Sequence, residues 1–469
     1  MILTEEQRNH YKRHIIVPEI GEEGQKKLLD STVFVYCENT DSLRPLAYYL
    51  AAFGTGRIFC CLKDKRDGDS LFAEVIDLNN DTKIDYLNNE TRKSHPQNRQ
   101  NRNSENEKNR PQDYRIVLGS LSFIKSLAAE LLSEDFIPTI VSVNGEWRGT
   151  LQSFQNEDLF KNFMDAVKTE NAEYKTSTNN NTKIKSPVFL ANALSAVLCT
   201  IEGVKLCLGI GGIKGDMLCY DLLSMEFSQT KSTVNLFEFL NEAYTFDLKK
   251  LSNARVLIAG VGGLGCPAAY GVTISGVNTL GLLDFDEVEM SNLNRQILHS
   301  FSRIGMPKAD SAKFILKKLN PDINIKTYKT ELTNDNAEEI FSQYDLVIAA
   351  VDNIPARYLI NDTCLSLNKP FSEAGVLRLD GTATTIVPYE GHCYRCLYPN
   401  VDSSKLAGDK GVLGPVPGVM GFIQAAEAVK VLAGLGKSLK NKILLFDSLE
   451  MDFNIIDIEK NPQCPSCSI

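Results

Sequence analysis

The sequence has little of what marks a secreted, membrane or nucleic-acid-binding protein. Its opening, MILTEEQR, is polar and lacks a signal-peptide pattern, and no run of 18 apolar residues predicts a membrane span. The net charge of −9 argues against a general binder of nucleic acids or anionic membranes, which would be basic. Twelve cysteines without a secretion signal favour reduced thiols or metal ligation over a disulfide framework. We therefore expect a cytoplasmic protein with no nucleic-acid or membrane partner.

What the chain does have is apolar material for sizeable cores and an internal repeat. It comprises 469 residues, of which 43% are hydrophobic and 23% charged, an ordinary globular mixture. Four segments of the second half echo the first half in the same order: 256–276 echoes 33–54, 344–352 echoes 114–122, 427–434 echoes 202–209, and 445–453 echoes 219–227. We predict two tandem homologous domains, 1–235 and 250–469.

Both predicted domains have the pattern of parallel α/β units. Continuous apolar runs such as 255–259 and 345–350, typical of buried strands, alternate with helical patterns. The tract 88–112 is polar and lacks aliphatic residues, and 170–186 is similarly polar. Such composition predicts solvated insertions, and we expect the first to be disordered.

A glycine-rich stretch in the second half, GVGGLG at 260–265, follows a strand-like run and opens a helical pattern. Glycines let a backbone approach phosphates closely, and a helix N-terminus offers N–H groups to them. Asp284 ends the next strand-like run, where a carboxylate suits ribose hydroxyls. Alone, this pattern is most often an NAD or FAD site, and it also occurs as a plain tight turn.

The polar residues that follow favour a triphosphate over a dinucleotide. SNLNRQ at 291–296 supplies amides and the guanidinium of Arg295, Lys308 follows in GMPK, and Asp352 ends another strand-like run. A hydride-transfer cofactor has only a pyrophosphate to hold. Clustered Arg and Lys with an isolated carboxylate suit a triphosphate and Mg²⁺ better. Taken singly, each could equally be a surface or turn residue.

Residues 253–469 resemble the MoeB/ThiF adenylyltransferases of the ubiquitin-activating-enzyme superfamily. The matching pieces are GVGGLG at 260–265, LLDFDEVEMSNLNRQ at 282–296, GMPKAD at 305–310, AAVDN at 349–353, CYRCL at 393–397, QAAEAVKVLAG at 424–434 and CPSC at 464–467. The resemblance implies Rossmann-like domains of the ThiF type and a Mg-ATP site that adenylates a C-terminal carboxylate.

The resemblance also assigns roles to individual residues. It places at the nucleotide Gly260, Gly262, Gly263, Gly265, Asp284, Asp286, Asn292, Arg295, Gln296, Lys308, Asp352 and Asn353. Among these it implies catalytic roles for Arg295, Lys308 and Asp352, and it makes Asp352 the magnesium ligand.

Two Cys-x-x-Cys pairs, Cys393/Cys396 and Cys464/Cys467, are knuckles of the kind that form a four-thiolate zinc site. The interval between the pairs exceeds the usual zinc-ribbon spacing, so a redox pair or disulfides remain possible from the spacing alone. The resemblance implies that the four cysteines hold one structural Zn²⁺, which would tie the C-terminal tail to the domain.

No cysteine lies between 397 and 463. Some relatives pass the activated carboxylate to a cysteine in this region. Here the loop 401–418 is rich in Gly and Pro, and we expect it to fold over a substrate tail. Cys266 and Cys364 are expected to be small buried side chains. We therefore predict that the acyl-adenylate ends this chain's own chemistry and that a thioester or sulfur-transfer step requires another protein.

The first half carries a degenerate copy of the nucleotide site. Its counterpart of the glycine loop is CENTDS at 37–42, which brings Glu38 and Asp41 to where phosphates would lie, and the counterpart of Asp352 is Ser122. We predict that this half binds no ATP.

The opening of the first half, HYKRHII at 10–16, resembles the opening helix of the family, from which an arginine reaches the partner's ATP in symmetric dimers. The stretch 242–256 before the second half has no matching Arg-x-x-Arg. We therefore predict an intramolecular pseudo-dimer in which Arg13 acts on the leaving phosphates, as an arginine finger does. The alternative is that Arg13 is a surface residue.

The substrate stays open at this stage. It is either a Gly-Gly-tailed ubiquitin-like or sulfur-carrier protein, or a ribosomal precursor peptide, each with a free C-terminus. Two other functions are a non-catalytic ATP-binding module, against which the intact Arg295, Lys308 and Asp352 argue, and an NAD-dependent oxidoreductase, which nothing after residue 284 favours. Because the pseudo-dimer already uses the usual dimer face, we expect a monomer.

Overall fold

The computed structural model describes residues 2–87, 113–170, 188–213, 215–231, 235–240, 248–399, 401 and 411–468. The predicted disordered tract 88–112 lies outside the described residues, as does the second polar stretch from residue 171 onward and most of the loop 401–418.

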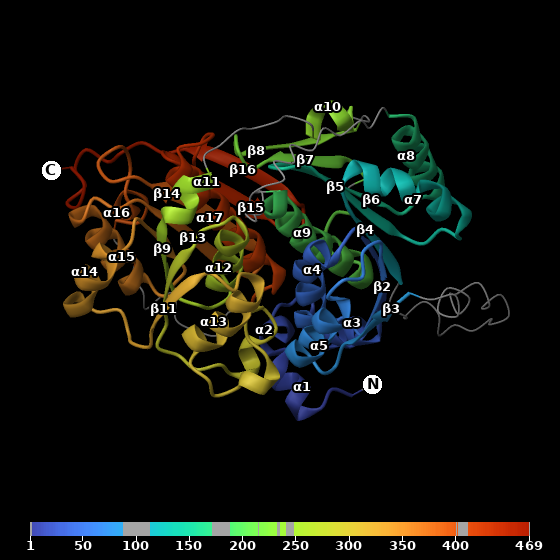
Figure 1. Cartoon of the computed structure of the whole chain (residues 1–469), viewed down its shortest axis with the longest axis horizontal. Coiled ribbons are helices and arrows are strands. Elements are labelled where there is room, and N and C mark those ends of the chain that lie inside the picture. The colour runs from blue at the N-terminus through green and yellow to red at the C-terminus, as the bar shows by residue number, and fades with distance from the viewer. Residues whose placement is uncertain are drawn as a thin grey trace.

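Two eight-stranded sheets with the same strand order form the framework (Figure 1). The first has the order β3-β2-β1-β4-β5-β6-β7-β8 and the second β11-β10-β9-β12-β13-β14-β15-β16. In each, five parallel strands are followed by three antiparallel ones. The predicted fold class, two Rossmann-like units in tandem, is confirmed.

The strands of the first sheet are β1 (Thr32–Cys37), β2 (Arg57–Leu62), β3 (Lys83–Tyr86), β4 (Tyr114–Gly119), β5 (Thr139–Asn144), β6 (Arg148–Phe154), β7 (Met217–Asp221) and β8 (Glu226–Thr230). Those of the second are β9 (Arg255–Ala259), β10 (Thr279–Leu283), β11 (Asn324–Tyr328), β12 (Leu346–Ala349), β13 (Phe371–Leu377), β14 (Asp380–Ile386), β15 (Lys442–Asp447) and β16 (Asp452–Asp457). Both sheets fall within the proposed domains 1–235 and 250–469, whose boundaries remain a prediction.

The helices cover both faces of each sheet. Those of the first half are α1 (Glu5–His10), α2 (Lys12–Ile15), α3 (Gly21–Asp30), α4 (Thr40–Ala52), α5 (Gly68–Leu78), α7 (Leu121–Ser133), α8 (Glu157–Thr169), α9 (Val188–Leu208) and α10 (Leu236–Leu240). Those of the second are α11 (Leu248–Asn253), α12 (Gly265–Ile274), α13 (Lys308–Leu319), α14 (Asn334–Ser342), α15 (Ile354–Ser366), α16 (Tyr394–Leu397) and α17 (Pro415–Ala433), with the short 3₁₀ turns η3 (Met290–Asn292) and η4 (Phe301–Arg303).

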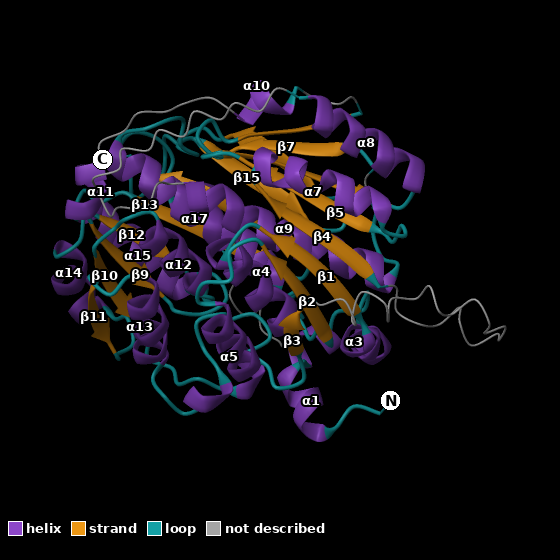
Figure 2. Ribbon diagram, turned by 45° about the vertical axis from the view of Figure 1, so that its right-hand side comes forward, coloured by secondary structure: helices purple, strands orange, loops and turns teal. Residues whose placement is uncertain are grey.

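The two halves share one hydrophobic core. Helices α4, α9, α12 and α17 lie between the two sets of strands (Figure 2), and a single cluster of buried side chains runs from one half into the other. The helices cross closely: a Cβ on Gly271 of α12 would lie 2.6 Å from the Cβ of Ala425 in α17 and 3.1 Å from Leu190 of α9. Each sheet has a separate cluster on its other face. This packing is the intramolecular pseudo-dimer that the sequence predicts.

Helices α9 and α17 are long and apolar enough, by length and composition alone, to cross a membrane. In the structure, however, the apolar window of α9 is 100% buried and that of α17 is 89% buried. Each also carries an equivalent buried ion pair, Glu202–Lys205 in α9 and Glu427–Lys430 in α17. They are therefore the core helices of the two halves. Their equivalent ion pairs are a further sign of the internal repeat.

A turn of each half also donates a backbone hydrogen bond to a turn of the other half. The N–H of Gly212 in the first half donates to Leu449 O in the second (3.2 Å), and the N–H of Lys437 in the second donates to Leu223 O in the first (2.8 Å). The edge strands β8 and β16 meet through the stacked rings of Phe227 and Phe453, whose centroids are 4.1 Å apart. The interface is thus approximately two-fold symmetric.

One cross-strand position differs in charge between the halves. Asp221 and Asp447 are equivalent, because each accepts backbone N–H groups two and three residues ahead. In the first half Arg148 faces Asp221, and its Nε lies 2.7 Å from the carboxylate. In the second half Asp380 faces Asp447 instead. Burial raises the pKa of Asp380, and the carboxylate of Asp447 adds to the shift.

Asp380→Arg should therefore stabilise the chain. Like charges directly opposite each other on a sheet are destabilising, and an opposite pair contributes about 0.2–1 kcal/mol. We expect a higher midpoint of thermal unfolding by circular dichroism. Asp380→Asn is the control, because it removes the repulsion without adding a cation and should give a smaller gain. An Asp380→Arg protein less stable than Asp380→Asn would contradict this reading of the pair.

Candidate functional site

A cleft of about 810 Å³ opens at the carboxyl ends of the parallel strands in the second sheet. It brings together eleven of the residues singled out from the sequence: Arg13, Gly260, Gly262, Gly263, Asp284, Asp286, Arg295, Gln296, Lys308, Asp352 and Asn353. All of them come from the second half except Arg13. Two further predicted residues, Gly265 and Asn292, do not line the cleft.

The glycine loop forms the floor of the cleft, and its glycines have different structural roles. Gly260 has φ +94°, and a Cβ there would lie 2.7 Å from Ala350 O. A Cβ on Gly265 would lie 1.8 Å from Gly260 O, so this residue lets α12 begin directly on the loop. A Cβ on Gly262 would meet only Gln296 Nε2, at 3.6 Å. Packing therefore requires Gly260 and Gly265, whereas Gly262 leaves space on the side of the cleft.

Asp284 anchors the loop at the end of β10. Its carboxylate accepts hydrogen bonds from the N–H groups of Val261 (2.7 Å) and Asp286 (2.9 Å). Burial raises the pKa of Asp284, while the charge of Lys308 and these N–H groups act in the opposite direction. Lys308 begins α13, and its Nζ lies 2.7 Å from Asp286. The carboxylates thus hold both the glycine loop and the lysine in place.

Arg295 and its neighbours occupy the turn after η3. Its Nη1 donates to Ser291 O and to Asn294 Oδ1, both at 2.8 Å. Asn292 is buried and caps the turn, since its Oδ1 accepts the N–H of Glu289 at 3.1 Å. Asn292 therefore shapes the segment that carries Arg295, and its predicted contact with the nucleotide remains a prediction.

Asp352 and Asn353 follow β12, where Asn353 Oδ1 caps α15 by accepting the N–H of Ala356 at 2.9 Å. One turn into that helix lies Arg357, a cleft residue that we did not predict. It forms an ion pair with Glu373 of β13 and donates to Val351 O at 2.8 Å. Burial lowers its pKa. Arg357 could have been predicted from the sequence by its spacing from Asn353, because residues four apart share a helix face.

A second unpredicted element supports the glycine loop from beneath. His299 Nε2 lies 3.0 Å from Val261 O, and its Nδ1 lies 3.0 Å from Ser311 Oγ, which accepts a hydrogen bond from Arg303 Nε. Burial lowers the pKa of His299 to about 3, so the imidazole is neutral. This arrangement lets His299 donate to the loop carbonyl. No sequence motif pointed to it.

Arg13 enters the cleft from the first half. Its backbone O accepts the N–H of Val412 at 3.1 Å, and the N–H of Leu413 donates to Arg378 O at 3.0 Å. The guanidinium of Arg378 in turn forms an ion pair with Glu19 of the first half at 3.2 Å. The segment after residue 410 is therefore held jointly by the opening of the first half and by the β13–β14 turn. This position agrees with the predicted reach of Arg13 across the interface.

In the first half, side chains occupy the donors that a phosphate would need. Asn39 Oδ1 accepts the N–H of Ser42 at 2.9 Å at the start of α4, and Glu38 Oε2 lies 3.4 Å from the N–H of Ser120. A phosphate would have to displace these contacts and approach Glu38. That this half binds no ATP remains a prediction.

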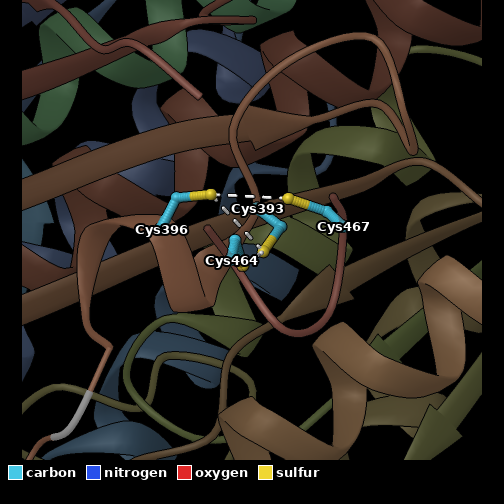
Figure 3. A group of neighbouring side chains, drawn as sticks. All are labelled: Cys393, Cys396, Cys464 and Cys467. Atoms are coloured by element: carbon cyan, nitrogen blue, oxygen red, sulfur yellow. Dashed lines mark hydrogen bonds between the residues drawn. The ribbon is translucent and has the colours of Figure 1, made fainter. Parts of the chain in front are cut away.

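The four predicted zinc ligands form one cluster (Figure 3). Their sulfur atoms all lie within 4.8 Å of one another, with 3.9 Å between Cys393 and Cys396, 3.6 Å between Cys393 and Cys464, and 3.4 Å between Cys396 and Cys467. Four thiolates bound to zinc at about 2.3 Å would be separated by about 3.8 Å. All four are free thiols in the structure, and their spacing is compatible with one shared zinc ion.

Comparison with known proteins matches the second half of the chain. Residues 236–466 match the ThiF family. Curated relatives named adenylyltransferase and sulfurtransferase MOCS3 are 44% identical in Culex quinquefasciatus, 45% in Xenopus laevis and 47% in Drosophila yakuba, each over 223 residues. The match covers 47% of this chain and 51%, 49% and 49% of these relatives. The chain thus spans about half the length of the curated relatives it matches.

Among solved structures, E. coli MccB with ATP is similar at 26% identity and a TM-score of 0.44, over 47% of this chain and 68% of that one. E. coli MccB with MccA gives 24% identity and the same TM-score and coverage. The sequence match at 236–466 coincides with the half that holds the glycine loop, the cleft and the cysteine cluster. The C-terminal half of the chain, over residues 236–466, belongs to the ThiF family.

Proposed function

We propose that the chain is an ATP-dependent adenylyltransferase that activates the C-terminal carboxylate of a small protein or peptide. The observation that carries this proposal is the cleft, where the glycine loop, Arg295, Lys308 and Asp352 of a ThiF-family domain meet Arg13 of the other half. An NAD-dependent oxidoreductase would not need this set of cations around its cofactor.

The cleft suits Mg-ATP in two respects. Gly262 leaves room for a phosphate beside the loop. Gln296 Oε1 is buried without a hydrogen-bond partner in the described part of the chain, and as an acceptor it suits a ribose hydroxyl or the adenine amino group. The cleft is also close to charge balance before any ligand binds, because six cationic side chains face five carboxylates. A tetra-anionic ATP would bring this set to a net charge of about −3, and Mg²⁺ would offset two of those charges when bound, with Asp352 as its proposed ligand.

The reaction joins two anions. A carboxylate oxygen of the substrate attacks the α-phosphorus in line, the new P–O bond forms, and the bond to pyrophosphate breaks. Because both reactants are negative, charge neutralisation matters more than a general base. Arg295 and Lys308 are fixed close to the glycine loop, where they stabilise charge on the phosphate oxygens. Asp284 positions the glycine loop and Asp286 positions Lys308 for this role.

The relatives named MOCS3 suggest the substrate class. Their name pairs adenylyl transfer with sulfur transfer, which suits a Gly-Gly-tailed sulfur carrier or ubiquitin-like protein. The precursor-peptide alternative stands beside it, because the divergent first half and the absence of cysteine between 397 and 463 set this chain apart from thioester-forming enzymes. The interface that symmetric relatives would use is filled within the chain, which supports a monomer.

ATP–pyrophosphate exchange tests the proposal directly. It should be run with a panel of Gly-Gly-tailed carriers and with small peptides encoded beside the gene. We expect exchange with one class, and we expect Asp352→Ala to abolish it because the metal ligand is lost. Asp322→Ala, on an exposed turn, is the matched control and should retain exchange. Mg-ATP binding without exchange for any candidate would favour a non-catalytic ATP-binding module.

Arg13→Ala should slow adenylation by roughly 10²-fold or more, judged from losses of arginine fingers that act across an interface. The change removes positive charge from the cleft but leaves the buried contacts of the opening segment. Arg8→Ala is the control, since Arg8 lies on the same opening and pairs with exposed Glu22. Unchanged turnover in a folded Arg13→Ala protein would refute the finger role.

We further propose that Cys393, Cys396, Cys464 and Cys467 bind one structural Zn²⁺. Burial would raise the pKa of Cys464, but N–H groups of Ser466 and Cys467 aimed at its sulfur hold it at about 7. Such N–H groups favour the thiolate that zinc requires. When bound, the ion would close the C-terminal tail onto the first knuckle and take no part in the reaction.

Metal analysis of the purified protein should give one zinc per chain. Cys464→Ser should lose the metal and lower the midpoint of thermal unfolding, because a structural zinc contributes folding free energy. Cys61→Ser changes a thiol of the first half that lies outside the cluster, and it should keep the full zinc content. A wild-type protein without metal whose four cysteines resist alkylation until reduced would instead indicate disulfides.

A further inference from the structure

The opening segment of the first half is fixed before it reaches the second half. The hydroxyl of Tyr11, a fully buried residue, donates to Asp81 Oδ2 (3.0 Å) and accepts from Asn79 Nδ2 (2.9 Å). Next to it, His14 Nδ1 lies 3.1 Å from Gln25 Oε1. Both anchors belong to the body of the first half. The backbone between them is therefore held at a defined position on the interface.

Asn294 of the second half binds that backbone. Its Nδ2 donates to His10 O at 2.6 Å and to Ser291 O at 3.2 Å. Its Oδ1 accepts from Arg295 Nη1 at 2.8 Å. The side chain is 1% exposed. One carboxamide thus joins a carbonyl of the first half to the guanidinium that lines the cleft of the second.

We propose that Asn294 is a positioning residue through which the first half orients Arg295 for the phosphates of ATP. This inference rests on the proposed function. Ser291 O accepts from the same Nη1 at 2.8 Å, so Asn294 Oδ1 is one of two fixed acceptors and the one that the first half holds in place. With only one acceptor left, the long arginine side chain would lose more rotamer freedom on binding phosphate, which weakens affinity. The acceptor is a neutral amide, so it directs Arg295 without neutralising its charge. A carboxylate at the same place would compete with the phosphates.

A double-mutant cycle on Mg-ATP affinity, measured by isothermal titration calorimetry, separates this role from a purely structural one. Asn294→Ala should raise the Kd for Mg-ATP roughly tenfold or more, as expected for a lost hydrogen bond to a charged group. In an Arg295→Ala background the same change should alter Kd less than about twofold, because residues that act through one group are not additive.

Two further variants complete the experiment. Asn294→Asp keeps an acceptor for Arg295 but loses the N–H groups that donate to His10 O and Ser291 O, and it should also raise Kd because it neutralises the guanidinium. Asn294→Ser, which keeps a small polar side chain, serves in place of the alanine variant if that protein does not fold. Asn9→Ala is the control: Asn9 lies on the same contact, with its Nδ2 3.9 Å from Met290 Sδ, and does not touch Arg295. Its Kd should equal that of the wild type.

The outcomes are distinct. Unchanged Kd in Asn294→Ala, or an equal further loss in the Arg295→Ala background, would overturn the positioning role while leaving the proposed function intact. A wild-type protein that does not bind Mg-ATP would overturn the proposed function, and the inference with it.

Discussion

The burial of α9 against α17 places every component of the cleft. These two apolar helices lie at the centre of a single core that both halves share. Helix α12, which follows the glycine loop, and its counterpart α4 pack beside them. The opening of the first half lies against the η3 turn and the residues around Val412. Arg13 lines the cleft for the same reason. The cleft is therefore a product of the interface as much as of the second sheet.

Comparing the two halves shows which structural features occur both with and without the glycine loop. The first half keeps the strand order, the buried pair Glu202–Lys205 and the turn cap at Asp221, all of which serve packing. In place of GVGGLG it has CENTDS at 37–42, and Ser122 stands at the counterpart of Asp352. In this loop Asn39 Oδ1 accepts the backbone N–H of Ser42. The fold of this half therefore does not depend on a glycine loop.

Much of this could be predicted from the sequence because the signals are local. The echoes at constant order predicted two equivalent sheets, the strand–glycine–helix pattern predicted the floor of the cleft, and paired cysteines predicted the cluster. Arg357 could have been predicted from its helical spacing to Asn353. His299 and Asn294 could not, because their roles depend on partners that the fold alone brings near. Asn294 lies 284 residues from His10 in the chain. The motif around Asn294 does not indicate that its side chain makes a contact across the interface.

The covalent link between Arg13 and the cleft has a consequence for how the site depends on protein concentration. In a symmetric dimer, an arginine supplied by the partner is lost when the dimer dissociates on dilution. Here the supplier is tethered, so its effective concentration at the cleft is set by the chain and not by the number of molecules in solution. In the arrangement that we propose, dilution of the protein would therefore leave Arg13 beside the cleft.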